Sequence, residues 1–341
     1  MNKKIKVAII GVGRIGMLLE QDKKRLKPAT HFGMWNTNKK AQLVAVCDED
    51  LGKEKIVKKL NKKVIFYEDA KKMLNETKPE IVSISTWKNT HFKFCKMCIE
   101  NKVKTIVLEK PLANTLKESK ILLNLIKKNK TKVLVNHRRR FDDEVIKLRK
   151  LLKNGKIGKI KQVSCFYVYG LLTTGTHVID TLRMLLNDVA GEIVNVVGIK
   201  NSSKDFTPKD DKNYDAILFF KSGLKVFMQS LNIKDYDIFD FYFYGTKGKI
   251  LFTDIGRTAN FYKIYKSPEH SNFTELNNKP LIIFGKKPRK QFDRLSNNAI
   301  SCLKNSKIKS LCTAQDSFYD MKIIDAIKLS AKKNSKILRV K

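Results

Sequence analysis

Short apolar runs alternate with amphipathic stretches in the N-terminal part of the chain. The apolar runs are rich in Val and Ile, as buried parallel strands are, and they lie at residues 4–10, 43–47, 64–66, 81–85, 105–108 and 133–135. The stretches between them repeat apolar residues at helical spacing, at residues 53–60, 69–74, 92–100 and 116–128. This alternation predicts a doubly wound parallel sheet.

The pattern changes after His137. A long strand is expected at residues 161–169, with helices on either side of it at residues 142–152 and 175–186. Strands then follow one another without helices between them, at residues 193–199, 214–220, 225–231, 237–244, 249–252 and 260–265, and helices return at 292–303 and 315–331. The sequence therefore predicts an α/β protein with two domains: an N-terminal Rossmann domain (residues 1–136), and a C-terminal α/β domain (residues 137–341) with a mostly antiparallel open sheet.

The expected C-terminal sheet carries apolar and aromatic residues on both faces. The clearest case is residues 238–244, which read Ile-Phe-Asp-Phe-Tyr-Phe-Tyr. Few helices remain to cover a second face, and sheets of this kind bury such a face by packing against another sheet. We expect a homodimer or homotetramer that assembles through the C-terminal sheet.

A glycine motif follows the first expected strand. Gly11, Gly13 and Gly16 form the pattern G-x-G-x-x-G, with Arg14 and Ile15 inside it. In a dinucleotide-binding loop, the first glycine permits the tight turn, the second lets a pyrophosphate approach the backbone, and the third lets the next helix pack closely. The N-terminus of that helix would face the anion.

Asp48 ends the second apolar strand, where a carboxylate accepts the ribose hydroxyls of NAD and repels the 2′-phosphate of NADP. We therefore expect NAD rather than NADP as the cofactor. The interval from Gly16 to Asp48 is longer than the usual spacing of about 20 residues. We interpret the polar stretch of residues 21–40 as an inserted loop that accounts for the excess.

Lys110 follows the apolar strand at residues 105–108, within Glu109-Lys110-Pro111. A charged pair and a proline at the end of a buried strand are not core residues. In an open α/β sheet, ligands bind at the carboxyl ends of the strands. The sequence thus places an ammonium group at the mouth of the expected site.

The formal net charge is +37, with 59 Lys and 11 Arg. Proteins that recognise nucleic acids favour Arg forks and localised patches, whereas these lysines are spread over every expected helix. We expect no nucleic-acid partner, but a positive field that attracts anionic substrates such as nucleotide sugars.

Six cysteines are scattered along the chain, and only Cys95 and Cys98 form a close pair. That pair lies in a helical pattern without a second pair, so we expect packed thiols, with a redox or metal role as the alternative, and no metal site. The N-terminus lacks a signal-peptide pattern and no apolar run is long enough to cross a bilayer, so we expect a cytoplasmic protein without a membrane span.

At this point the chain resembles the Gfo/Idh/MocA oxidoreductases, the glucose-fructose oxidoreductase and inositol dehydrogenase family. The resemblance covers nearly the whole length. It rests on motifs that occur in the same order: the glycine loop, Asp48, Ser85-Thr86-x-x-x-x-His91, Glu109-Lys110-Pro111, Arg139-Arg140-Phe141, Gly155-Lys156-Ile157-Gly158 and Gly175-Thr176-His177-Val178-Ile179-Asp180.

The resemblance implies hydride transfer between a nicotinamide cofactor and a hydroxyl carbon of a sugar, cyclitol or nucleotide sugar. It places the catalytic lysine at Lys110 and the catalytic histidine at His177. The implied cofactor-binding residues are Gly11, Gly13, Arg14, Ile15, Gly16, Asp48, Thr86, His91, Glu109 and Lys110. The implied substrate-binding residues are Lys110, Tyr167, Thr173, Thr176, His177 and Asp180.

The chain departs from the family pattern at two positions. Thr173 stands where an aspartate often precedes the histidine by four residues, and Trp87 replaces a proline. We therefore assign proton transfer to His177, an imidazole that titrates near neutral pH, with Lys110 stabilising the developing alkoxide.

Several assignments keep an alternative. Tyr167 either lines the sugar site or packs in the core, and the arginines at 138–140 either bind a phosphate or form a solvated helix entrance. The preferred function is an NAD-dependent sugar or nucleotide-sugar dehydrogenase, with a role in surface glycan synthesis as one setting. The alternatives are an NAD-using glycosidase or epimerase without net redox change, and a non-catalytic regulatory protein on the same scaffold.

Overall fold

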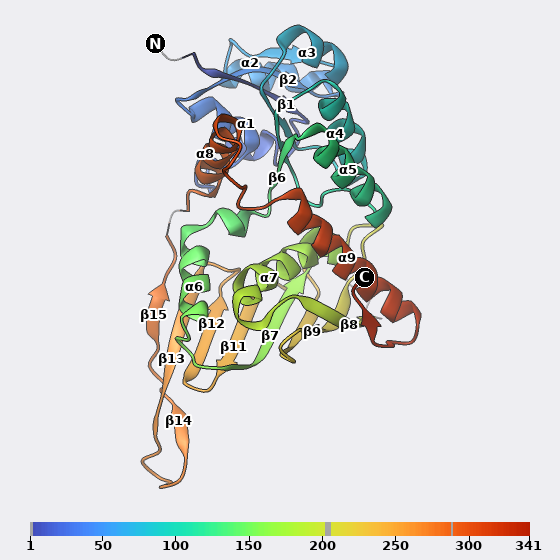
Figure 1. The fold of residues 1–341 in the computed structure, drawn as a ribbon. Helices are drawn as coiled ribbons and strands as arrows, with labels where there is room; N and C mark the ends of the chain where they lie inside the picture. The colour runs from blue at the N-terminus through green and yellow to red at the C-terminus, as the bar shows by residue number, and fades with distance from the viewer. Residues whose placement is uncertain (1–2, 202–205, 288) are drawn as a thin grey trace. The chain divides into compact units, whose positions relative to one another are not determined.

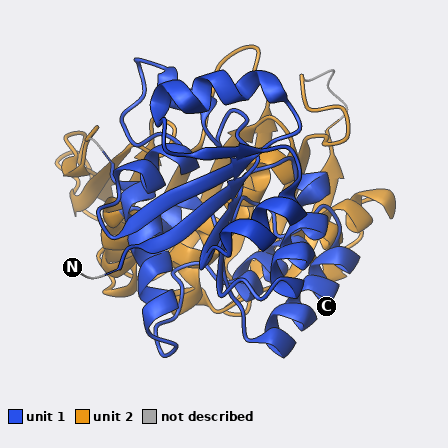
Figure 2. Ribbon diagram, turned by 90° about the horizontal axis from the view of Figure 1, so that it is seen from above, with its two compact units in different colours: residues 1–142, 288–321 blue, residues 143–287, 322–341 orange. Residues whose placement is uncertain are grey.

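The computed structural model describes residues 3–201, 206–287 and 289–341. The chain divides into two compact units (Figure 2): unit 1 comprises residues 1–142 and 288–321, and unit 2 comprises residues 143–287 and 322–341. The division into two domains at residue 137, expected from the sequence, remains a prediction. No described helix is both long enough and apolar enough to cross a lipid bilayer.

Unit 1 is built on a six-stranded sheet in the order β3-β2-β1-β4-β5-β6, and every neighbouring pair is parallel. This confirms the predicted doubly wound parallel sheet. Helices α4 and α5 lie on one side of the sheet and α1 and α8 on the other (Figure 1). The strands are β1 (Ile5–Ile10), β2 (Ala41–Cys47), β3 (Ile65–Tyr67), β4 (Ile81–Ile84), β5 (Thr105–Leu108) and β6 (Lys132–Val135). The helices are α1 (His31–Thr37), α2 (Glu54–Leu60), α3 (Ala70–Thr77), α4 (His91–Glu100), α5 (Leu116–Asn129) and α8 (Gln291–Lys304), with α9 (Ala314–Lys332) beginning in this unit.

The stretch of residues 21–40 is not an inserted polar loop, so that prediction was wrong. It contains α1, whose Phe32, Met34 and Trp35 are buried in the core of unit 1. The Trp35 indole N–H also donates to Ser83 Oγ on β4 at 2.7 Å. A helix this short offers too few positions for its period to be visible in the sequence.

The extra residues between Gly16 and Asp48 instead form a segment that interrupts one helix and divides it into two parts. The chain makes a single turn after the glycine loop, with Met17 N donating to Gly13 O, and then leaves the helical path. It returns at α1, where the N–H groups of His31 and Phe32 donate to the carbonyls of Ile15 and Gly16.

In a continuous α-helix these N–H groups would donate to carbonyls one turn earlier in the chain. The segment between Gly16 and His31 is therefore an excursion that interrupts the helix and rejoins it at its next hydrogen bonds. Leaving this excursion out shortens the interval between Gly16 and Asp48 to about 20 residues, the usual spacing of a dinucleotide-binding fold.

Unit 2 contains a mixed sheet in the order β14-β13-β12-β11-β7-β10-β9-β8-β16, with β15 paired to β13. Only the pairing of β10 with β7 is parallel among the described strands, which confirms the predicted mostly antiparallel sheet. The strands are β7 (Ile160–Val168), β8 (Ile193–Lys200), β9 (Tyr214–Phe220), β10 (Lys225–Leu231), β11 (Asp240–Gly245), β12 (Gly248–Thr253), β13 (Thr258–Lys266), β14 (Thr274–Leu276), β15 (Leu281–Phe284) and β16 (Leu338–Arg339).

Helices α6 (Asp143–Lys153) and α7 (Thr176–Ala190) lie over one face of this sheet (Figure 1). Strand residues facing α7, such as Val163, Cys165 and Met228, are fully buried. The opposite face carries one row of register partners across seven strands, all of them only half-buried: Val197, Ile217, Phe227, Ser164, Tyr242, Leu251 and Asn260. We call this row the open-face row.

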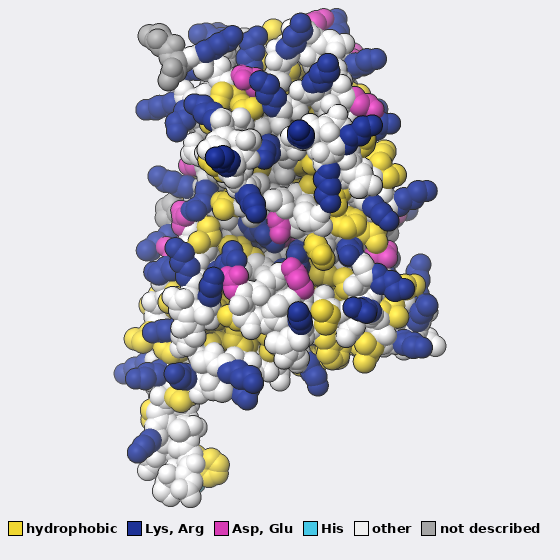
Figure 3. All heavy atoms as spheres, in the orientation of Figure 1, with side chains coloured by type: hydrophobic (Ala, Val, Ile, Leu, Met, Phe, Trp, Pro, Cys, Tyr) yellow, Lys and Arg dark blue, Asp and Glu magenta, His cyan; other side chains and the backbone are white. Residues whose placement is uncertain are grey.

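Lys and Arg side chains are scattered over the face of the molecule shown in Figure 3 rather than gathered into one patch. The large positive charge is therefore distributed on that face, as the even spread of lysines along the sequence predicts. That the chain has no nucleic-acid partner remains a prediction.

Candidate active site

The glycine loop follows β1 and packs against the residues at the end of β4. Gly11 has a φ of +88°, and a Cβ there would lie 2.7 Å from Thr86 Cγ2 and 2.9 Å from the Ser85 carbonyl carbon. The Ser85 hydroxyl donates to Gly11 O at 2.7 Å. Only glycine meets both requirements, the left-handed backbone and the close approach of the second strand.

The rest of the loop leaves space for an anion. A Cβ at Gly16 would lie 2.2 Å from Gly11 O, so Gly16 is what allows the turn to close this tightly. A Cβ at Gly13 would meet no atom within 4 Å. The N–H groups of Gly13, Arg14 and Ile15 have no hydrogen-bond acceptor among the described residues. Unsatisfied N–H groups at the start of a helix favour phosphate binding, so these residues fit a dinucleotide pyrophosphate.

Asp48 lies beside the glycine loop. Its Oδ2 accepts from Val12 N at 2.8 Å, and its Oδ1 accepts from Lys53 Nζ at 2.8 Å and from Asp50 N at 3.1 Å. The Asp48 side chain is 9% exposed and that of Lys53 is 19% exposed. The carboxylate expected to meet the ribose therefore already has an ammonium partner. The sequence analysis did not identify Lys53, although a lysine five residues after such an aspartate is a visible signal.

Glu109 is a buried carboxylate held from two sides. His31 Nε2 on α1 lies 2.9 Å from Glu109 Oε1, and Asn136 Nδ2, just after β6, donates to the same oxygen at 2.5 Å. Burial alone would raise the pKa of Glu109, but the hydrogen bond and charge of His31, the Asn136 amide and the Lys110 ammonium together lower it to about 2. Glu109 is therefore ionised at neutral pH.

This network also places Lys110, which directly follows the anchored Glu109. Its charge lowers the pKa of Glu109, so the ammonium lies close enough to the carboxylate to interact with it. The Lys110 side chain is half-buried. His31 had no visible context in the sequence, because its partner is 78 residues away.

His91 fastens the ends of β4 and β5 to each other. Its Nδ1 lies 2.7 Å from Pro111 O and its Nε2 lies 3.2 Å from Thr86 O. Burial lowers the pKa of His91 even though both carbonyls favour the charged form. A neutral ring donates one proton, and the shorter contact makes Pro111 O the acceptor. Thr86 accepts a bond from Thr90 Oγ1 at 2.8 Å, whereas Trp87 is 82% exposed.

In unit 2, the predicted substrate residue Thr173 lies in the π-helical turn just before α7, and Thr176, His177 and Asp180 lie in the first turns of α7. From Leu171 to Leu186, only Thr173, Thr174 and His177 are not buried. Thr173 and His177 are four residues apart, which places them on one face of the helical segment. This segment thus presents the predicted catalytic imidazole together with the threonine that replaces the family aspartate.

The other predicted substrate residues are buried. Thr176 and Asp180 have exposed fractions of 0% and 1%. Tyr167 is fully buried, and its hydroxyl donates to Tyr214 O at 2.7 Å and accepts from Tyr214 N at 3.1 Å. Both contacts favour the packing alternative for Tyr167, and its substrate role remains a prediction.

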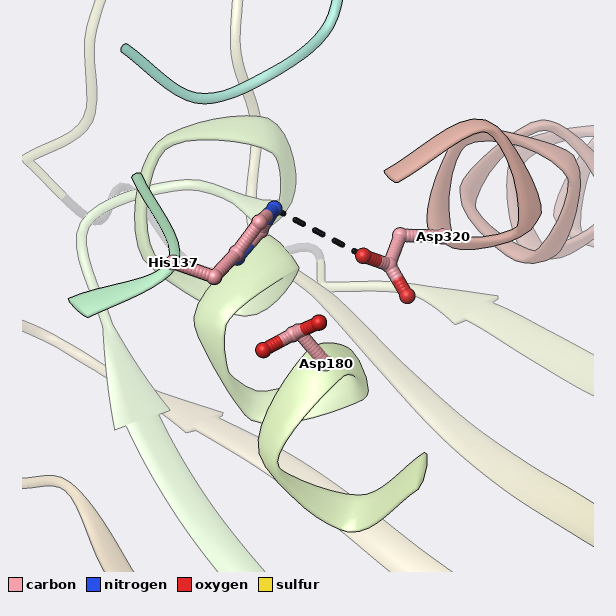
Figure 4. A group of neighbouring side chains, drawn as sticks. All are labelled: His137, Asp180 and Asp320. Carbon is pink, nitrogen blue, oxygen red and sulfur yellow. Dashed lines mark ion pairs between the residues drawn. The ribbon is translucent and has the colours of Figure 1, made fainter. Parts of the chain in front are cut away.

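Two pairs of charged or polar side chains lie within unit 1, outside the predicted site. His137 Nε2 lies 3.5 Å from Asp320 Oδ2, and both side chains are buried (Figure 4). Arg140 interacts with Asp316 at 3.3 Å, while Arg139 is buried. The pairing of Arg140 indicates a structural role rather than phosphate binding. Asp180, also labelled in Figure 4, belongs to α7 of unit 2.

The Cys95 and Cys98 thiols are both fully buried on α4. Burial raises the pKa of Cys95 to about 12, and it raises the pKa of Cys98 well above its ordinary value. Thiolates are the reactive and metal-binding form of cysteine. These two residues are therefore packed thiols of the core.

Comparison with known proteins identifies the class to which this fold and site belong. Residues 5–137 match the oxidoreductase family model for the NAD-binding Rossmann fold, and residues 149–338 match the model for the C-terminal α/β domain of the same family. The chain belongs to this family, the Gfo/Idh/MocA oxidoreductases, as the order of its motifs predicted.

Named relatives are similar to parts of the chain. A D-glucoside 3-dehydrogenase of Escherichia coli is 24% identical over 282 residues, which cover 73% of this chain and 77% of the relative. A myo-inositol 2-dehydrogenase of Thermotoga maritima is 26% identical over 155 residues, which cover 46% of this chain and 42% of the relative. The chain spans about half the length of other curated relatives that it matches, at 56%, 49% and 55%.

The fold also matches solved structures over its whole length. An oxidoreductase from Agrobacterium radiobacter, solved in complex with NAD+, L-tartaric acid and magnesium, has a TM-score of 0.74 and 17% sequence identity. The match covers 99% of this chain and 99% of that chain. At this identity the likeness shows the fold alone.

Replacing Glu109 with Gln tests the buried network through pH. Because the pKa of Glu109 falls from an ordinary value of 4.5 to about 2, its contribution to stability is complete above about pH 4.5 and is lost as the pH falls toward 2. Across this window, the free energy of unfolding, measured with denaturant, should fall by about 3 kcal/mol more in wild type than in Glu109→Gln. Glu100→Gln, at an exposed position of α4, is the control. Parallel stability curves for wild type and Glu109→Gln would contradict the assignment.

Proposed function

We propose that this protein is an NAD-dependent oxidoreductase that acts on a hydroxyl carbon of a sugar, cyclitol or nucleotide sugar in the cytoplasm. The observation that carries the proposal is the arrangement in unit 1: the open glycine loop, Asp48 beside it, and Lys110 anchored at the end of β5 by the ionised Glu109. Two relatives are named as dehydrogenases of glucosides and of myo-inositol, and these names support a polyol as the substrate class.

NAD bound at this loop would supply the hydride acceptor, and the residues of the chain would handle the proton. Oxidation of an alcohol needs a base near neutral pKa, which is the role proposed for His177. Lys110 hydrogen-bonds the reacting oxygen and stabilises the alkoxide as it forms. Glu109 bonds to His31 and His91 bonds to Pro111 O, so their proposed role is to hold the segment that carries Lys110.

The net charge of +37 supports an anionic substrate. A positive field raises the local concentration and the association rate of such molecules. Nucleotide sugars carry a diphosphate and are the activated donors for surface glycans, so we include their oxidation or reduction in the proposal. We infer no nucleic-acid or membrane partner.

The open-face row supports a homodimer or homotetramer. Phe227, Tyr242 and Leu251 are half-buried apolar or aromatic residues on one face of the sheet. Apolar and aromatic side chains on an uncovered sheet face are stabilised when a second sheet covers them. We propose that a second copy of the chain packs there.

Lys110→Ala tests the catalytic assignment. Loss of the ammonium removes the group that stabilises the alkoxide, so turnover of the best substrate among myo-inositol, methyl D-glucoside and UDP-glucose should fall about 100- to 1,000-fold. The dissociation constant for NAD+ should stay within about threefold of wild type, because the loop and Asp48 are unchanged. Lys104→Ala, an exposed lysine just before β5, is the matched control. Unchanged turnover in Lys110→Ala would refute the role, while tightly held NAD without NADH accumulation in wild type would indicate a redox-neutral reaction.

Asp48 and Lys53 should shift cofactor preference in opposite directions. Asp48→Ala removes the ribose acceptor and should lower the NAD+ over NADP+ preference in kcat/KM by about tenfold or more. Lys53→Ala leaves the carboxylate without its ammonium partner, so repulsion of the 2′-phosphate grows and the preference for NAD+ should rise. Lys55→Ala, exposed on α2, should change neither. A wild-type protein that prefers NADP+ would show that Asp48 does not select NAD.

Phe227→Glu tests the proposed assembly. A charge in the middle of the open-face row would have to be buried in the interface, so light scattering should show a monomer where wild type is a dimer or tetramer. Lys221→Glu introduces a carboxylate outside the row, in the exposed turn before β10, and should keep the assembly. A monomeric wild type at micromolar concentration would exclude it.

A further inference from the structure

Asp211 is a fully buried carboxylate in the segment that precedes β9. Its Oδ1 accepts from Leu172 N at 2.8 Å, and its Oδ2 accepts from Thr173 N at 2.6 Å and from the Thr173 hydroxyl at 2.6 Å. It lies 38 residues from Thr173 in the sequence. A carboxylate thus meets the position where the chain has threonine in place of the family aspartate.

The surrounding backbone holds this contact in place. Gly170 N donates to Asn213 Oδ1 at 2.8 Å, and Leu171 N donates to Lys212 O at 3.0 Å. A Cβ at Gly170 would lie 2.5 Å from Asp211 Oδ2, so a larger residue there would displace the carboxylate. The single turn of π-helix that leads into α7, η5 (Leu171–Gly175), is therefore docked on residues 211–213 by consecutive hydrogen bonds.

The Thr173 hydroxyl is consequently restricted in what it offers a ligand. A hydroxyl has one proton to donate, and Thr173 donates it to Asp211. The two lone pairs of the hydroxyl oxygen can only accept, and the neighbouring negative charge strengthens this oxygen as an acceptor. Thr173 is partly exposed on the same helical face as His177.

We propose that Asp211 acts through Thr173 to supply the carboxylate character that position 173 lacks, so that Thr173 accepts a hydrogen bond from a substrate hydroxyl beside the carbon that is oxidised. Asp211 is a positioning residue, and the ligand is a vicinal diol or polyol that donates to Thr173. This inference rests on the proposed function and extends it to how the substrate is oriented.

A purely structural role for Asp211 predicts something different. Its bonds to the N–H groups of Leu172 and Thr173 cap the start of the helical segment, and a cap contributes to stability whether or not a hydroxyl is present at position 173. The two roles separate when Asp211 is changed in a background that lacks the Thr173 hydroxyl.

The experiment is a double-mutant cycle with Thr173→Val and Asp211→Asn, read as KM and kcat for myo-inositol and methyl D-glucoside with NAD+. Thr173→Val should raise KM about tenfold, and Thr173→Ser should stay within about threefold of wild type. Asp211→Asn should raise KM by a similar factor in the wild-type background and by less than about twofold in Thr173→Val. Asp215→Asn, the same charge change at a carboxylate of β9 that accepts from Ser230 and not from η5, should leave KM within about twofold of wild type.

The outcomes separate the two proposals. Equal KM in wild type and Thr173→Val, or an Asp211→Asn effect that persists undiminished in Thr173→Val, would overturn the role of Asp211 while the proposed function stands. Where wild type does not turn over, the same cycle is measured as polyol affinity in the presence of NADH by calorimetry. A wild type that binds NADH but neither oxidises nor binds any of these polyols would overturn the proposed function and this role together.

Discussion

The buried carboxylate of Glu109 is the constraint on which unit 1 depends. An ionised carboxylate is costly to bury unless hydrogen bonds compensate for the lost water. Here His31 from α1 and Asn136 from the end of β6 provide that compensation, so three distant segments must be in place together. The same arrangement determines where the backbone of Lys110 lies, which links the stability of the sheet to the placement of the proposed catalytic ammonium.

The parallel sheet and the mixed sheet could both be predicted, because each strand has its own apolar signature. The split helix could not. Hydrophobic periodicity identifies only a helix that is continuous in the sequence. Here the helix is interrupted after one turn and resumes at His31, and the two halves are joined by bonds of His31 to Ile15 and of Phe32 to Gly16. The anomalous spacing of Asp48 was the one visible sign, and it was assigned to the wrong residues.

The candidate site divides in the same way. The glycine loop, Asp48, Lys110 and His177 stand in motifs whose local spacing carries the signal, so the sequence singled them out. His31 contacts Glu109, Lys53 contacts Asp48, and Asp211 contacts Thr173. The first and last of these pairs join residues far apart in the chain, and single-sequence patterns contain no information about such pairs. For Tyr167 the sequence left two roles open, because alternation along a strand does not reveal that its hydroxyl bonds to the Tyr214 backbone.

The central claim is that one carbinol oxygen is held by Lys110 and deprotonated by His177. A crystal structure of the protein with NADH and the best polyol substrate would measure it directly, as the distances from that oxygen to Lys110 Nζ and to the nearer nitrogen of His177. We predict that both distances fall within hydrogen-bond range, about 2.6–3.2 Å. An ammonium and an imidazole that contact different ligands, or a polyol bound away from either one, would contradict the account.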